Sequence, residues 1–157
     1  MRYLRAFLLP LAVLLFGASN VLSAQDAQAR LWDAAIAGDT AAIRKAVNDG
    51  ARVDSLDTRR SQNGRFALNW AALGNHAGAV QLLLDLKAPI EAENLTGFTA
   101  LNHAAEAGSL DAAKILLAAG ADPDHANKMG MTPVIVATEN GHEAVAKLIE
   151  AAPRKKK

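Results

Sequence analysis

The stretch LNHAAEAGSLDAAKILLAAGADPDHAN (Leu101–Asn127) is followed, after a shift of 33 residues, by a second stretch with the same pattern, VIVATENGHEAVAKLIEAA. The shift places Gly108 on Gly141 and Leu116 on Ile149. An equal step toward the N-terminus places Gly108 on Asn75. A fixed period of this length is typical of a solenoid, in which each unit buries its apolar faces against its neighbours.

Each unit has the same internal order. A first helix of small and apolar residues, such as Ala100–Ala107, ends at a residue that tolerates the left-handed conformation. These helix-ending residues are Gly38, Asn75, Gly108 and Gly141. A second helix follows, with apolar residues at helical spacing. Then a polar residue stands three positions before a glycine, which predicts a tight turn; the pairs are Ser61 and Gly64, Asn94 and Gly97, Asn127 and Gly130.

This order of helices, helix stops and turns resembles the ankyrin repeat, most clearly in GFTALNHAAEAGSLDAAKILLAAGAD and GMTPVIVATENGHEAVAKLI. The resemblance covers about Leu31 to Ala151 and implies an all-α solenoid of stacked helix-turn-helix units with projecting hairpin fingers. We expect an ankyrin-repeat domain over residues 25–153, of about four repeats: 27–57, 58–93, 94–126 and 127–153. The second unit departs from the pattern. Lys87 replaces the stop glycine, and the finger SLDTRRSQNGR is four residues longer than the period allows.

The alanine content follows from such stacking. Inner helices that pack at short distance leave no room for a branched side chain at Ala71, Ala104 and Ala137. Leucine and isoleucine on the outer helices fill the layer between helix pairs, and we expect Leu83, Leu116 and Ile149 there.

Residues 1–24 have the three parts of a secretory signal peptide. Arg2 and Arg5 precede the uncharged apolar run Ala6–Phe16, and Ala24 is a suitable last residue before cleavage. The run is short for a membrane span, which needs about 20 apolar residues. We therefore expect export to the periplasm, or secretion, with no stable membrane insertion after cleavage. A retained N-terminal anchor that tethers the domain is the alternative.

Charge and composition limit the partners and the chemistry that the chain could have. Without Arg2 and Arg5 the chain has 15 basic and 16 acidic residues, and four of the basic ones form the tail 154–157. The body then carries 11 − 16 = −5, which disfavours a nucleic-acid partner. We expect the basic tail to be a solvated extension of the last helix. The chain has no cysteine, which excludes disulfides and thiolate chemistry.

No phosphate-binding loop, serine elbow or zinc motif occurs, and the carboxylates show no pairing suited to acid–base catalysis. We therefore expect no enzyme activity, no cofactor and no metal. His76 and His142 follow helix stops, where the ankyrin pattern has a structural histidine. His103 and His125 lack the partners that a metal site requires.

Two groups of residues in the first two units leave alternatives open. Trp32 and Trp70 either pack between repeats or line the groove as binding anchors. The arginines of the long finger either contact an acidic partner or are neutralised by nearby carboxylates. The arginines are Arg59, Arg60 and Arg65, and the carboxylates are Asp54, Asp57, Glu91 and Glu93.

The ankyrin resemblance implies a scaffold, expected to be monomeric, that binds another protein on a concave face made of finger tips and inner helices. An accessory or inhibitor protein that covers an enzyme's surface is a further alternative. The variable positions of the pattern flank the finger glycine and close the inner helix. They correspond to Gln62, Asn63, Arg65 and Leu73; to Leu95, Thr96, Phe98, Glu106 and Ala107; and to Lys128, Met129, Met131, Glu139 and Asn140.

Four of these residues, Leu95, Phe98, Met129 and Met131, are apolar where a turn needs no apolar side chain. We expect Phe98 to be the anchor of a protein-binding site, flanked by Met131 and Arg65. The alternative is that the apolar side chains fold back onto neighbouring fingers.

Overall fold

The computed structural model describes residues 9–154, and within this range every regular element is a helix. The all-α prediction is confirmed. The helices are α1 (Leu9–Ala37), α2 (Thr40–Asn48), α3 (Ala67–Leu73), α4 (Ala77–Asp85), α5 (Ala100–Ala107), α6 (Leu110–Ala118), α7 (Pro133–Glu139) and α8 (Glu143–Glu150).

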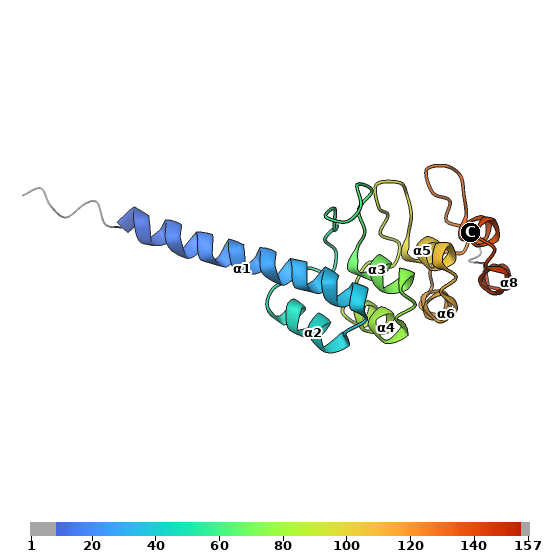
Figure 1. Cartoon of the computed structure of the whole chain (residues 1–157), viewed down its shortest axis with the longest axis horizontal. Coiled ribbons are helices and arrows are strands. Elements are labelled where there is room, and N and C mark those ends of the chain that lie inside the picture. Colours follow the sequence, from blue (N-terminus) through green and yellow to red (C-terminus); the bar gives the residue numbers. More distant parts are fainter. Residues whose placement is uncertain (1–8, 155–157) are drawn as a thin grey trace, which may run out of the picture.

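The helices stack as pairs in two rows (Figure 1). The inner row contains α1, α3, α5 and α7, and the outer row contains α2, α4, α6 and α8. Three loops precede α3, α5 and α7 and rise on the side of the inner row away from the outer helices. We call these loops the first, second and third finger, spanning residues 51–66, 88–99 and 121–132. Each predicted repeat thus contains one helix pair.

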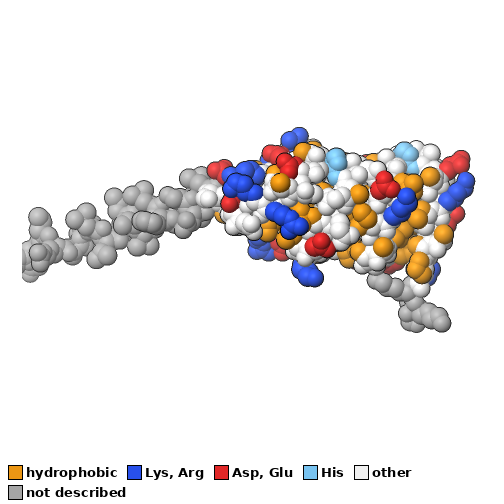
Figure 2. All heavy atoms as spheres, turned by 90° about the horizontal axis from the view of Figure 1, so that it is seen from below, with side chains coloured by type: hydrophobic (Ala, Val, Ile, Leu, Met, Phe, Trp, Pro, Cys, Tyr) orange, Lys and Arg blue, Asp and Glu red, His pale blue; other side chains and the backbone are white. Residues whose placement is uncertain are grey.

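The opposite face is formed by the outer helices (Figure 2). Charged side chains of both signs are interspersed toward the N-terminal end of the array, and hydrophobic ones gather toward its C-terminal end. A shallow hollow between α4 and α6 is lined by Gln81, Lys114, Ile115, Ala118 and Ala119.

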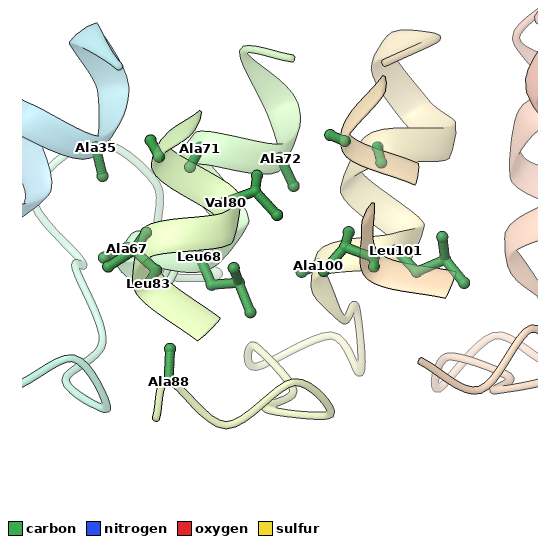
Figure 3. Close-up of a cluster of buried hydrophobic side chains, with 14 of the residues drawn as sticks. Ala35, Ala67, Leu68, Ala71, Ala72, Val80, Leu83, Ala88, Ala100 and Leu101 are labelled. Carbon is green, nitrogen blue, oxygen red and sulfur yellow. The ribbon is translucent and has the colours of Figure 1, made fainter. Parts of the chain in front are cut away.

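The core is one cluster that runs along the array and combines alanines with larger apolar side chains; Figure 3 shows Ala71 and Ala72 of α3 near Val80 and Leu83 of α4. Ala71, Ala104 and Ala137 are completely buried, as the close approach of the inner helices requires. Leucine and isoleucine fill the space between pairs as predicted, and Leu83, Leu116 and Ile149 are also inaccessible. Stability therefore comes mainly from contacts between neighbouring units.

The predicted helix stops are confirmed by their backbone conformation. Gly38, Asn75, Gly108 and Gly141 all have positive φ, between 53° and 77°. The second stop of the second unit is unusual, because Lys87 adopts φ 67° where the next unit has Gly120 at φ 92°. A side chain with a Cβ atom is strained in this region.

Each joint between repeats contains one side chain that bonds the last turn of the preceding inner helix. The contacts are His76 Nε2 to the Ile36 carbonyl (2.9 Å), Ser109 Oγ to the Leu73 carbonyl (3.1 Å) and His142 Nε2 to the Glu106 carbonyl (3.1 Å). The structural role predicted for His76 and His142 is confirmed, and a serine performs it in the third unit.

Helix α1 joins the predicted signal peptide to the first repeat. Residues 1–8 lie outside the described part of the chain, but α1 runs without a break across Ala24. Residues 23–26 are exposed, and Ala27 is the first of the following residues to be fully buried. In the range that the structure describes, no helix combines the length and the apolar character needed to cross a bilayer.

The C-terminal tail begins differently from the prediction of a solvated extension. Arg154 turns back onto the end of α8, where its Nη1 donates to the carbonyls of Ile149 (3.0 Å) and Ala152 (2.6 Å). Its Nε lies 2.9 Å from Asp124 Oδ2 in the third finger. Carbonyls at a helix end have no partner within the helix and attract a guanidinium, and therefore Arg154 turns back and does not extend into solvent. Residues 155–157 lie outside the described part.

Candidate protein-binding surface

The fingers are joined to each other by backbone hydrogen bonds. Leu95 N donates to the Asn63 carbonyl (2.9 Å), and Lys128 N donates to the Thr96 carbonyl (3.1 Å). The Lys128 ammonium also donates to the Leu95 carbonyl (2.9 Å). These bonds hold the three fingers as one ridge.

The predicted turns are confirmed in each finger. The glycine N–H donates to the carbonyl three residues earlier, from Gly64 to Ser61, Gly97 to Asn94 and Gly130 to Asn127. The buried Asn127 side chain adds rigidity, because its Oδ1 accepts from both Met129 N (2.9 Å) and Met131 N (3.0 Å).

Glycine is required at position 97 for two reasons. Its φ is +81°, and a Cβ atom there would lie 2.8 Å from Lys128 N. The second and third fingers therefore approach each other too closely for any side chain.

The residue after each finger glycine is directed back to its own inner helix. The Arg65 guanidinium lies 4.7 Å from the centre of the Trp70 ring, and the Phe98 ring lies 5.3 Å from the His103 ring. Met131 occupies the equivalent position in the fourth unit and packs against the core. Phe98 and Met131 are half-buried and do fold back, but Phe98 contacts its own inner helix and Met131 the core, whereas the alternative expected contact with neighbouring fingers.

The other two apolar finger residues project into solvent. Leu95 is 56% exposed and Met129 is 67% exposed, the highest values for large hydrophobic side chains among residues 23–154, whose burial the structure describes. They lie on adjacent fingers, connected through Lys128. We call Leu95 and Met129 the apolar finger tips.

The long first finger is fixed by a buried carboxylate, which the sequence indicated only as one of four possible partners for the finger arginines. Asp57 is completely buried and accepts hydrogen bonds from Arg59 Nε (2.8 Å), Arg59 N (3.0 Å) and Trp70 Nε1 (3.2 Å). Burial opposes ionisation, but the bonds from Arg59 and Trp70 outweigh it and hold the pKa of Asp57 below its usual value. Asp57 and Arg65 also form an antiparallel bridge at the finger base.

Neutralisation of the finger arginines differs in part from the prediction. Asp57 does pair with Arg59, but the second partner is Asp33 of α1, 3.0 Å from Arg59 and 3.3 Å from Arg60. Asp54 instead pairs with Arg52. The remaining two carboxylates face elsewhere: Glu91 accepts from Asp122 N, and Glu93 pairs with His125.

Both tryptophans take the packing role of the two alternatives, and a role as binding anchors stays a prediction. Each packs one side against the core and is covered by an arginine of the first finger, with Arg59 4.8 Å from the centre of the Trp32 ring. Trp32 Nε1 donates to the Ser55 carbonyl. Both rings are half-buried and act as platforms for the finger.

A polar cluster lies at the base of the second finger. His103 is 2% exposed, its Nδ1 lies 2.9 Å from Glu106 Oε2, and its Nε2 has no hydrogen-bond partner. Burial lowers the pKa of His103, and the positive charge of Arg65 lowers it further. The hydrogen bond to Glu106 raises the pKa but does not outweigh these two effects. The hydrogen bond from His103 in turn lowers the pKa of Glu106. Glu106 is half-exposed and stands 4.0 Å from Arg65 Nη2.

The remaining predicted binding residues lie at inner-helix ends and on the third finger. Leu73 closes α3 and is half-buried, whereas Lys128, Glu139 and Asn140 are exposed. Asn140 Nδ2 donates to the Val136 carbonyl (2.8 Å) and thereby caps α7. Of the predicted binding residues, Arg65 contacts Glu106 and Lys128 contacts Leu95.

In the part of the chain that the structure describes, no three histidine, cysteine, aspartate or glutamate side chains lie close enough together to hold a metal ion. His103 and His125 each contact one glutamate instead.

Stacked helix pairs with a ridge of hydrogen-bonded fingers define a repeat solenoid, a class whose long surfaces serve recognition. A family model for ankyrin repeats, in three copies, matches residues 31–127, and the chain belongs to the ankyrin-repeat family. The fourth helix pair lies beyond the match and has the same architecture. A comparison with curated proteins finds no significant match.

Family membership gives the general function. Ankyrin repeats form a non-catalytic protein-interaction fold, and the chain is built as a protein–protein interaction scaffold. The ridge of fingers and the exposed ends of the inner helices, which we call the finger face, provide the candidate surface.

Proposed function

We propose that this chain is an exported, monomeric scaffold that captures a partner protein on its finger face. The observation that carries the proposal is the pairing of exposed apolar side chains with a fixed backbone. Leu95 and Met129 project from fingers that are bonded to each other. An apolar group on a preorganised backbone binds without the cost of ordering a loop.

The surroundings of the apolar finger tips favour a contact with a protein. Phe98 and Met131, in the same two fingers, add half-buried apolar side chains, and the exposed Lys128 and Glu139 add charged ones. An apolar centre with a polar rim is the usual anatomy of a protein interface. Arg59 and Arg60 are already paired with carboxylates, and therefore we place the centre of the contact on the second and third fingers.

Export is supported by the basic start and apolar run of residues 1–24 and by the burial pattern of α1. Cleavage after Ala24 leaves Ala27 and Leu31, both fully buried in the first repeat, in place. Gln28, which bonds the backbone of Arg52 in both directions, is also retained. The mature chain therefore keeps these contacts of its first repeat.

N-terminal sequencing and cell fractionation test the export step. We expect a mature chain that starts near Gln25 in the periplasmic or secreted fraction. A full-length chain in the membrane fraction would instead support the tethered alternative and contradict the export proposal.

A photo-crosslinking residue placed at Leu95 tests the binding step. We expect it to label one defined protein, whereas the same residue at Lys114 on the outer face labels none. The double variant Leu95→Ser/Met129→Ser should weaken binding of the labelled partner at least tenfold, which corresponds to about 1.4 kcal/mol. The matched control Lys114→Ser/Lys147→Ser changes the outer face and should leave binding unchanged. Equal effects of both double variants would refute the finger face as the binding surface.

A further inference from the structure

Of the two methionines that the structure describes, Met129 is by far the more exposed. The chain has three methionines, at positions 1, 129 and 131, and the first lies outside the described residues. Met129 is 67% exposed at the tip of the third finger. Met131, two residues later in the same finger, is half-buried and packs against the core.

We propose that Met129 is a site of reversible oxidation to methionine sulfoxide, and that this oxidation changes the apolar finger tip into a polar one without unfolding the array. The proposal rests on the proposed function for its effect on binding. The modification itself stands on the geometry of the finger.

The reaction needs only a peroxide that reaches the thioether. The sulfur attacks one oxygen of hydrogen peroxide, the O–O bond breaks, and a sulfur–oxygen bond forms. The sulfur loses two electrons, and the remaining oxygen leaves as water once a proton has been transferred to it. Susceptibility follows exposure, and sulfoxide reductases restore the thioether. An exposed position on a finger tip is open to both the oxidant and the reductase.

The structure of the finger does not depend on the Met129 sulfur. The backbone N–H groups of Met129 and Met131 both donate to Asn127 Oδ1, and Gly130 N donates to the Asn127 carbonyl. Asn127 N in turn donates to the Met131 carbonyl (3.0 Å). These bonds hold the turn whether or not the sulfur carries an oxygen.

The chemical change does alter the surface. A sulfoxide is a strong hydrogen-bond acceptor, and desolvating it in an apolar contact without a donor is unfavourable. The exposed Leu95 stands on the neighbouring finger, connected through Lys128. Oxidation therefore removes one of the two apolar finger tips and leaves the other.

Peptide mass spectrometry after graded hydrogen peroxide treatment of the folded, full-length protein tests the assignment. We expect Met129 to gain one oxygen several-fold faster than Met131. In Met131→Leu the rate at Met129 should be unchanged, and in Met129→Leu the slow rate at Met131 should be unchanged. Equal rates at the two positions in the folded protein would overturn the proposal.

Thermal melting of the same samples tests the claim that the fold is retained. Protein oxidised at Met129 alone should keep its Tm and return to its original mass with a pair of reductases that cover both sulfoxide epimers. A Tm that falls in step with Met129 oxidation would mean that the modification is a structural lesion, and it would refute the proposal.

The effect on binding is measured with the protein crosslinked through position 95. Peroxide should reduce its binding to the unsubstituted chain and to Met131→Leu, but not to Met129→Leu. Equal peroxide sensitivity of Met129→Leu would refute the binding effect. If untreated protein binds no partner, the proposed function fails, while the mass and melting results still decide the oxidation site.

Discussion

Asn75, in the second repeat, caps a helix of the third. Its Oδ1 accepts hydrogen bonds from the backbone N–H groups of Asp111 (3.1 Å) and Ala112 (3.0 Å) in the first turn of α6. The residue at the N-cap position of α6, Ser109, makes no side-chain capping bond and donates instead to the Leu73 carbonyl. Asn75 also has a positive φ of 53° in the turn that follows the end of α3. One residue thus serves as a helix stop in its own repeat and as a cap in the next.

Asn75→Ala should lower the free energy of unfolding by about 2 kcal/mol, because it removes the cap and places a Cβ without a compensating bond at positive φ. Urea denaturation measures the change. Asn75→Gly keeps the conformation and loses only the cap, so it should cost less than Asn75→Ala. Asn75→Asp keeps an acceptor at the helix start and should stay within about 0.5 kcal/mol of the parent. If the alanine and aspartate variants are equally stable, the cap contributes nothing.

Lys87→Gly should raise the free energy of unfolding by about 1 kcal/mol. Lys87 is exposed at φ 67°, and glycine adopts this conformation without strain. The control Lys114→Gly replaces an exposed lysine within α6 and should be destabilising by about 1 kcal/mol. A destabilised Lys87→Gly would show that the lysine side chain outweighs the backbone strain.

Stability should fall as the pH is lowered below about 6.5. His103 has a lowered pKa in the folded chain, because burial and the charge of Arg65 disfavour its protonated form. The unfolded chain, with an ordinary histidine pKa near 6.5, binds the proton first, and acid therefore favours unfolding. Glu106 also has a lowered pKa in the folded chain. The stability that this carboxylate adds is therefore lost only when the pH falls below the ordinary glutamate pKa near 4.3.

Urea midpoints measured between pH 7 and pH 5 check this expectation. His103→Leu removes the titrating group and should flatten the profile in this window, while the other three histidines remain. An unchanged slope in His103→Leu would assign the pH dependence to those histidines.

Arg154→Ala should lower the Tm, since it removes the bonds from the guanidinium to the carbonyls of Ile149, in the last turn of α8, and of Ala152, just after the helix. The side chain is 40% exposed, and we expect a loss of about 1 kcal/mol, the usual net value for such bonds. Arg154→Lys keeps the charge but not the planar fork and should recover only part of the loss. Loss of the tail beyond Arg154 should have no effect, and a larger effect there than for Arg154→Ala would contradict the capping role.

Much of the fold could be predicted because its determinants are local and periodic. The positive-φ residues at the inner-helix ends and the buried alanines of the inner helices repeat at a fixed spacing. The same regularity predicted the turns at Gly64, Gly97 and Gly130. A repeating backbone conformation restricts the residue type at each turn, and the sequence therefore carries the signal.

The contacts between repeats could not be predicted in the same way. Asp57 bonds Trp70, and Asp33 bonds Arg59, across a finger whose length departs from the period. Such pairs depend on the three-dimensional path of an insertion, which no spacing rule gives. Asn75 was predicted as a helix stop, but nothing in its local sequence, or in that of Ser109, indicates which neighbouring helix each residue contacts.

Which of the apolar finger residues are exposed also needed the structure. Leu95 and Phe98 belong to the same finger, yet one projects and the other lies on His103. The residue directly after the finger glycine returns to the inner helix in each unit, and this regularity is the signal that distinguishes Phe98 from Leu95.

The bonds between repeats have a direction along the chain. At the joints, His76, Ser109 and His142 reach back to carbonyls of the preceding unit. Between fingers, the N–H groups of Leu95 and Lys128 also reach back to earlier carbonyls. A chain that emerges N-terminus first, from a ribosome or a translocon, therefore presents each new unit with acceptors that are already in place. The array can therefore form one repeat at a time, from its N-terminal end toward its C-terminal end.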